Sequence, residues 1–145
     1  MRMIDIGAKP RTERLAVARG RVAMSPETAA RAGAGEVEKG DVLAAARLAG
    51  VMAAKRTPDL VPLCHPIALS GVEVEARAVK RGVEIVATVR TVDRTGVEME
   101  ALTAVAAGCL TVYDMLKRYQ RDMVLEEIVL VEKKGGRSGH YRRGR

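Results

Sequence analysis

The segment Thr95–Lys117, TGVEMEALTAVAAGCLTVYDMLK, constrains the fold more than any other part of the chain. Its apolar residues recur at steps of three and four, which predicts one long helix with a single apolar stripe. The stripe consists of Leu102, Val105, Cys109, Val112 and Leu116. The middle of the segment is built from small residues, and Gly108 there lowers helix stability. We therefore expect close packing against another element to require it.

Both ends of this predicted helix carry charge. Glu98 and Glu100 stand at its beginning, where a helix N-terminus favours carboxylates. Asp114 and Lys117 lie three residues apart near its end and share a face. An unbroken helix separates Glu100 from Asp114 by roughly 20 Å, too far to act on one atom. Either these are ordinary solvated helix ends, the commoner case for charged residues, or a second copy of the chain brings them together.

Length and charge limit the class of protein. A chain of 145 residues is expected to form one domain, 1–145, with an irregular arm at 1–10 and a flexible basic tail at 135–145. The net charge of +7 favours anionic partners, either nucleic acid, phosphorylated metabolites or an acidic surface. The chain has no Phe, no Trp and three Tyr, so it lacks the aromatic residues on which single-stranded nucleic acids stack. Phosphorylated small molecules are therefore the favoured partners, and nucleic acid is not expected.

Cysteine usage and hydropathy give two further expectations. The two cysteines, Cys64 and Cys109, belong to no CxxC pair, so no metal site is expected. We see neither a signal peptide nor a membrane span, which predicts a cytoplasmic protein without membrane partners.

Local signals then divide the chain into strands and helices. Arg14–Met24 is predicted to be a strand with Gly20 as a bulge or turn. Ser25 and Pro26 are typical of a helix start, and the short helix is expected to end near Gly33–Gly35. Asp41 is expected to cap a second helix that runs to about Lys55. That helix should rest on a sheet through its small apolar residues Val42, Ala45, Ala49 and Met52.

The remaining segments predict the sheet. Gly71–Lys80 and Val83–Val92 alternate apolar and polar residues around Arg81–Gly82, which indicates a β-hairpin with one wet face. Met123–Glu132 is expected to be another strand. This order of elements predicts an α+β fold, ferredoxin-like in outline, whose antiparallel sheet is covered on one face by helices.

The segment Lys55–Ser70, KRTPDLVPLCHPIALS, is the least regular part of the chain. Its three prolines break helix and strand, yet it is rich in apolar residues, so we expect it to be packed down. Those residues are Leu60, Val61, Leu63, Cys64 and Ile67. His65, fixed between Cys64 and Pro66, is either a site residue or a structural histidine bonded to a carbonyl.

Several cations stand beside glycines. Lys39 precedes Gly40 and the second helix, where it could face an anion or simply be solvated. Lys133, Lys134 and Arg137 surround Gly135–Gly136 and could wrap a phosphate, while a frayed tail is the expectation for residues 142–145.

Together, several segments resemble the cyclic pyranopterin monophosphate synthase (MoaC) family of molybdenum cofactor biosynthesis. The resemblance spans Asp5 to Gly139. It is carried by KGDVLAAARLAGVMAAKRTPDLVPLCHP, SGVEVE, TGVEMEALTAVAAGCLTVYDMLK and KKGGRSG. It implies a lyase of the phosphorus–oxygen type that converts a cyclic dihydro-GTP intermediate into cyclic pyranopterin monophosphate and releases pyrophosphate. It also implies a ferredoxin-like fold and a hexamer, a trimer of dimers with the active site at the dimer interface. We expect no required cofactor, and the sequence leaves open whether magnesium accompanies the substrate phosphates.

The resemblance also assigns the site. Its catalytic positions fall on Asp114, Lys117, Lys39 and Lys133. Its substrate-binding positions fall on Leu63, Cys64, His65, Glu98, Met99, Glu100 and Arg14, and Arg137 is expected to add a cation for the phosphates. A lysine crowded by other cations should have a lowered pKa and act as acid or base, although the sequence leaves open which lysine does so.

Two other classes of protein remain as alternatives. An RNA-binding ferredoxin-like module would account for the positive charge and would bind bulk RNA with a steep salt dependence. A small allosteric domain would bind a nucleotide without turning it over, so release of pyrophosphate distinguishes it from an enzyme.

Overall fold

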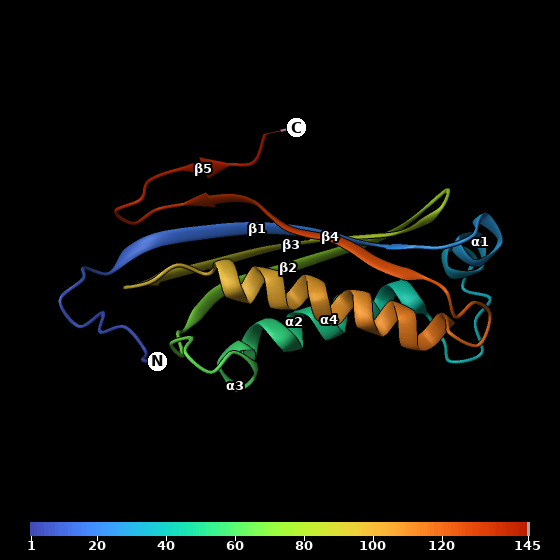
Figure 1. The fold of residues 1–145 in the computed structure, drawn as a ribbon, viewed down its shortest axis with the longest axis horizontal. Coiled ribbons are helices and arrows are strands. Elements are labelled where there is room, and N and C mark those ends of the chain that lie inside the picture. The colour runs from blue at the N-terminus through green and yellow to red at the C-terminus, as the bar shows by residue number, and fades with distance from the viewer. Residues whose placement is uncertain (145) are drawn as a thin grey trace.

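A computed structural model describes residues 1–144 as one antiparallel sheet with helices on one face (Figure 1). The elements are β1 Thr12–Ala23, α1 Pro26–Ala34, α2 Val42–Lys55, α3 Thr57–Leu60, β2 Leu69–Val79, β3 Gly82–Asp93, α4 Glu98–Leu116, β4 Val124–Lys134 and β5 Tyr141–Arg142. The strand order is β2-β3-β1-β4-β5. The chain therefore has the expected α+β, ferredoxin-like fold.

Capping residues set the starts of the first two helices. The Ser25 hydroxyl accepts a hydrogen bond from Thr28 N at 3.2 Å, and Pro26 is the first residue of α1. Gly35 ends α1 in the left-handed conformation at φ 72°. The Asp41 carboxylate accepts from Ala44 N at 2.9 Å and caps α2. These local predictions are confirmed because a cap needs only its own next turn.

Glycines allow α4 to lie directly on its neighbours. A Cβ at Gly108 would stand 2.8 Å from Ile85 Cδ1, which confirms that packing requires a small residue there. A Cβ at Gly20 would stand 2.5 Å from Val105 Cγ1 of α4. The bulge expected at Gly20 lies across from it, in β4, where the register shifts and Glu127 has φ 53°. Most of the predicted stripe is fully buried, and only Leu102 is half-buried.

The buried face of α2 differs from the prediction. Val42 is buried as expected, but Met52 is 53% exposed. The buried line runs along Val42, Ala46, Gly50 and Ala54. The reason is that α2 packs against both α4 and β2: a Cβ at Gly50 would stand 3.0 Å from Val74 Cγ1 and 3.1 Å from the Ala104 carbonyl oxygen. The closest contact line therefore follows the smallest side chains.

The irregular segments also differ from the predictions. The loop after α2 contains the short helix α3, and Leu60 and Leu63 are 65% and 43% exposed, so the expected packing of the whole loop is wrong for a single chain. Residues 1–11 contain no helix or strand. Within the expected flexible tail, Tyr141–Arg142 form β5 and pair with β4, because the glycine-rich turn before them reverses the chain. Arg145 of that tail lies outside the described residues.

By length and mean hydropathy alone, α4 would pass as a membrane-spanning helix. Its apolar composition has another explanation in the fold. Nine of its residues are buried, and the helix packs against β1, β3 and β4 and against α2. Hence α4 is the core helix of the domain.

Candidate functional site

The end of α4 carries an ion cluster, here called the C-terminal cluster, that consists of Lys39, Asp114 and Lys117. Lys39 Nζ lies 2.8 Å from Asp114 Oδ2, and Lys117 Nζ lies 2.9 Å from Asp114 Oδ1. Lys39 Nζ also donates to the Asp114 carbonyl oxygen at 3.3 Å. One carboxylate thus holds two ammonium groups, one from its own helix and one from the turn before α2, 75 residues away in sequence.

Asp114 and Lys117 each favour the charged form of the other. Hydrogen bonds from Lys117 and then Lys39 lower the pKa of Asp114 to about 2. The hydrogen bond to Asp114, together with the charge of that carboxylate, raises the pKa of Lys117. In a single chain Lys117 is therefore not the lysine with a lowered pKa, because its nearest partner is an anion and not another cation. About half of each side chain is exposed, so the cluster is open to an anionic ligand.

The opposite end of α4 carries a pair, here called the N-terminal pair, of the half-buried Cys64 and the buried Glu100. The Cys64 thiol lies 3.8 Å from Glu100 Oε2. Glu100 is only 2% exposed, and burial raises its pKa to about 7 against the favourable hydrogen bonds it receives. Burial, followed by the charge of Glu100, raises the pKa of Cys64. A carboxyl group in this position can hold or release a proton near neutral pH.

The other residues expected near this pair are accessible. Leu63 and Met99 are 43% and 40% exposed. His65 and Glu98 are half-buried, and the His65 carbonyl oxygen lies 3.7 Å from the Cys64 thiol. The loop of residues 62–66, PLCHP, therefore reaches the beginning of α4 through the contact between Cys64 and Glu100. A single site that contains the loop and the start of α4 requires this contact.

A third group, here called the basic turn, consists of Arg14, Lys133, Gly135, Gly136 and Arg137. Arg14 is 8% exposed, and its guanidinium donates to the carbonyl oxygens of Asp93 and Arg94 at 3.1 and 3.3 Å. Lys133 Nζ donates to the Gly135 carbonyl oxygen at 3.2 Å and to the Ser138 hydroxyl. Arg137 is exposed.

The glycine pair of the basic turn encloses a side chain of the protein. Gly135 and Gly136 have φ values of 93° and 80°, and a Cβ at either would collide with the backbone or side chain of residues 13 and 14. The sequence suggested that these glycines wrap a phosphate. In the described chain the two glycines curve around Arg14, which fills the space that they enclose. A phosphate would therefore contact the side chains of this turn and not the backbone of the glycines.

The three groups occupy two ends of the molecule (Figure 1). Arg14 is bonded to the segment Asp93–Arg94 that leads into α4, so the basic turn lies toward the same end as the N-terminal pair. The C-terminal cluster lies at the other end, beside the turn that follows α1. Since α4 is continuous from Glu98 to Leu116, a single chain does not bring Asp114 to Glu100.

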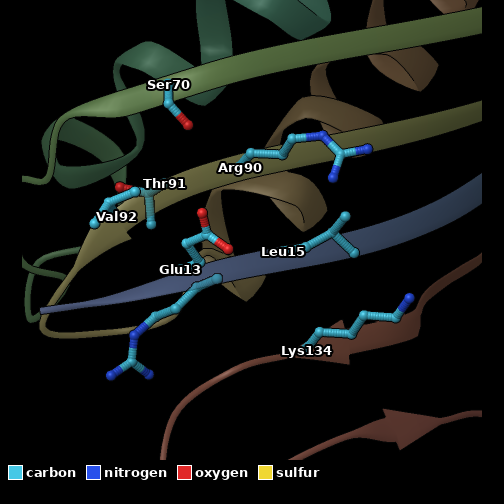
Figure 2. A pocket seen from close by; sticks show the side chains of 8 residues that line it. Glu13, Leu15, Ser70, Arg90, Thr91, Val92 and Lys134 are labelled. Atoms are coloured by element: carbon cyan, nitrogen blue, oxygen red, sulfur yellow. The ribbon is translucent and has the colours of Figure 1, made fainter.

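Two cavities lie near these groups. The larger, about 360 Å³, opens on the uncovered face of the sheet (Figure 2), where Glu13 and Leu15 of β1 lie beside Ser70, Arg90 and Lys134 of β2, β3 and β4. Among the expected site residues only Arg14 borders it, and strand alternation turns its side chain toward the helices. A cavity of about 290 Å³ borders Lys39 directly. This smaller cavity is the better candidate for a substrate site, because Lys39 of the C-terminal cluster is part of its lining. Its lining consists of Glu38, Lys39, Met115, Arg118 and Tyr119.

Three residues around the site were not anticipated from the sequence. Ser138 holds Lys133, and Glu38 and Tyr119 lie beside Lys39. Ser138 follows the glycine pair closely and could have been suspected, but nothing local connects Tyr119 with Glu38, 81 residues away. Within residues 1–144, no three His, Cys, Asp or Glu side chains converge as a metal site.

Comparison with known proteins gives one consistent result. The sequence model of the MoaC family matches residues 3–136. A cyclic pyranopterin monophosphate synthase of Thermomicrobium roseum is 59% identical over 144 residues, which cover 98% of this chain and 87% of that protein. The protein of the same name from Roseiflexus sp. (strain RS-1) is 60% identical over 97% of this chain and 90% of its own length. Its counterpart from Heliobacterium modesticaldum is 56% identical, with coverage of 97% and 89%.

Proposed function

This chain belongs to the MoaC family, and from that membership we propose that it is a cyclic pyranopterin monophosphate synthase of molybdenum cofactor biosynthesis. Its substrate is the cyclic dihydro-GTP intermediate, and its second product is pyrophosphate. The reaction class is that of a phosphorus–oxygen lyase. The protein is cytoplasmic, requires no cofactor of its own, and accepts substrate phosphates with or without magnesium.

The observation that carries this proposal is the carboxylate of Asp114 held between two ammonium groups. Loss of pyrophosphate leaves negative charge on the departing oxygens, and fixed ammonium groups stabilise such charge. Asp114 orients both lysines, so a phosphate that approaches the cluster meets cations already in place. Lys133, Arg137 and Arg14 add positive charge for a triphosphate.

The proton transfers of the reaction need a group that titrates near neutral pH. Lys117 is not that group in the isolated chain, because its pKa is raised. Glu100, with a pKa of about 7, has the required property and lies next to Cys64. We assign proton transfer to Glu100 and charge stabilisation to the C-terminal cluster.

A complete site then requires two chains. Roughly 20 Å of helix separates Glu100 from Asp114. In an antiparallel pair of α4 helices, the beginning of one would meet the end of the other. Exposed apolar side chains on and around α4 support such contact: Leu63, Met99 and Leu110 are 43%, 40% and 61% exposed. We propose a hexamer, a trimer of dimers, with the active site at the dimer interface.

The test uses the product of the upstream enzyme as substrate and measures pyrophosphate together with the pterin product. The wild-type chain is expected to form both in equal amounts. Formation of neither, with binding of the substrate intact, would support a nucleotide sensor. Salt-sensitive retention of bulk RNA without turnover would support the RNA-binding alternative.

Lys117→Ala is expected to lower turnover at least about a hundredfold, because it removes one of the two ammonium groups. The melting temperature should hardly change, since the side chain is 52% exposed. Lys80→Ala, in the exposed turn between β2 and β3, is the matched control and should turn over normally. Near-normal turnover by Lys117→Ala would remove Lys117 from the mechanism, and loss of the fold would make it structural.

A further inference from the structure

The turn that carries Lys39 has few hydrogen bonds within itself. Residues 36–40 join α1 to α2 and contain no helix or strand. Within the turn, Gly40 N donates to the Val37 carbonyl oxygen at 3.0 Å, and Gly40 has φ 114°. Lys39 is exposed. The position of its ammonium group must therefore be set by contacts from outside the turn.

Tyr119 supplies the central contact of this kind. Its hydroxyl accepts a hydrogen bond from Glu38 N at 3.0 Å, one residue before Lys39. Its own backbone N–H donates to the Leu116 carbonyl oxygen at 2.8 Å, which fixes it to the last turn of α4. The same turn of helix carries Asp114. Tyr119 thus connects the backbone beside Lys39 to the element that carries the partner of Lys39.

The ring of Tyr119 is itself held in place. The Arg31 guanidinium lies 4.4 Å from the ring centroid, as a cation over an aromatic face, and donates to the Glu36 carbonyl oxygen at 3.2 Å. Arg118 forms an ion pair with Glu38. Contacts from α1 and from the end of α4 therefore hold both sides of the turn. Tyr119, Lys39 and Glu38 also line the cavity of about 290 Å³ described above.

We propose that Tyr119 is a positioning residue that holds the backbone of residues 36–40 so that Lys39 stays on Asp114. It acts through Lys39 and does not itself take part in the reaction. The proposal rests on the proposed function for its effect on turnover, but the placement of Lys39 is measurable without substrate.

The test compares wild type, Tyr119→Phe and Tyr113→Phe. Tyr119→Phe removes the hydroxyl that accepts from Glu38 N and keeps the ring. Tyr113→Phe is the matched control, because its hydroxyl donates to the Arg121 carbonyl oxygen at 2.8 Å near the same end of α4 and touches neither Glu38 nor Lys39. Trace acylation at neutral pH, followed by peptide mass spectrometry, reports the reactivity of each lysine amine.

In Tyr119→Phe, acylation of Lys39 is expected to rise about fivefold, the effect of one net hydrogen bond. Lys117 and Lys80 should react as in the wild type, and kcat/KM should fall by a similar factor. Tyr113→Phe should leave Lys39 and Lys80 unchanged, whereas Lys117 lies near enough to Tyr113 for its pKa to depend on it and is not part of this control. Unchanged Lys39 reactivity in folded Tyr119→Phe would overturn the proposal, as would an equal rise at all three lysines.

If Tyr119→Phe does not fold, Arg31→Met serves in its place, because it removes the cation over the ring and the bond to Glu36 while it keeps the hydroxyl. The same selective rise at Lys39 is expected, and its absence overturns the proposal. If the wild-type protein releases no pyrophosphate but Tyr119→Phe still shows the selective rise at Lys39, the proposed function is refuted and the positioning role stands.

Discussion

The ionisation of Glu100 makes the free energy of unfolding depend on pH. Burial raises its pKa to about 7 from 4.5 in the unfolded chain. Below pH 4.5 both states are protonated. As the pH rises from 4.5 to about 7, the unfolded state releases its proton first, so Glu100 makes folding progressively less favourable. Above this window the loss is complete and amounts to about 3 kcal/mol.

The prediction is that Glu100→Gln removes this pH dependence. Between pH 4.5 and about 7, the unfolding free energy of the wild type should fall by about 3 kcal/mol relative to that of the variant. Above about pH 7 the difference between the two proteins should stay constant. Denaturant unfolding of both proteins at several pH values measures it. A difference that does not vary with pH would show that Glu100 has an ordinary pKa.

His65 is half-buried, and a variant distinguishes a site residue from a structural histidine. The carbonyl oxygen of this residue lies 3.7 Å from the Cys64 thiol. We predict that His65→Ala weakens substrate binding about tenfold and lowers the unfolding free energy by less than about 1 kcal/mol. Substrate titration and thermal unfolding give the two values. Unchanged affinity with a large fall in melting temperature would identify a structural histidine.

At the scale of elements, the contact between α4 and β1 depends on Gly20. We predict that Gly20→Ala lowers the unfolding free energy by about 1–3 kcal/mol, because the new methyl group would stand 2.5 Å from Val105 Cγ1. A valine in a helix has one strongly preferred rotamer and cannot easily turn away. Denaturant unfolding measures the loss. Gly144→Ala, with no atom within 4 Å of the new Cβ, is the control and should change stability by less than about 0.5 kcal/mol.

A double variant tests whether Val105 is the cause. Val105→Ala removes the methyl group that Gly20→Ala meets, so the double variant should be more stable than the sum of the two single losses predicts, by about 1 kcal/mol. Strictly additive losses would place the strain elsewhere, for example at Ile128, whose Cγ1 would stand 3.1 Å from the same Cβ.

At the scale of the whole molecule, the separation of Glu100 from Asp114 makes the two-chain site testable. Glu100→Gln and Asp114→Asn are each expected to be inactive. When the two proteins are dissociated, mixed and reassembled, a mixed dimer carries both lesions in one site and neither in the other. Random pairing should then restore about a quarter of wild-type activity, measured as pyrophosphate release. If verified mixed dimers stay inactive, the two carboxylates do not share a site across the interface.

The sequence by itself determined the elements of this protein. The caps at Ser25 and Asp41, the alternation of the hairpin and the stripe along α4 were all predicted, because each depends on residues within one or two turns of each other. The fold class followed from the order of those elements. The motifs also identified the family, since the resemblance spans nearly the whole chain.

Only the tertiary structure decided which of these residues meet. The ammonium of Lys39 reaches Asp114 across 75 residues, Tyr119 reaches Glu38 across 81, and Arg14 fills the concavity of Gly135 and Gly136. It also decided the direction in which the pKa of Lys117 shifts, which the sequence left open, and it exposed Met52. The physical reason is that periodicity fixes where a side chain points relative to its own element. Its partner, burial and pKa depend on how distant elements pack, and no local spacing records that.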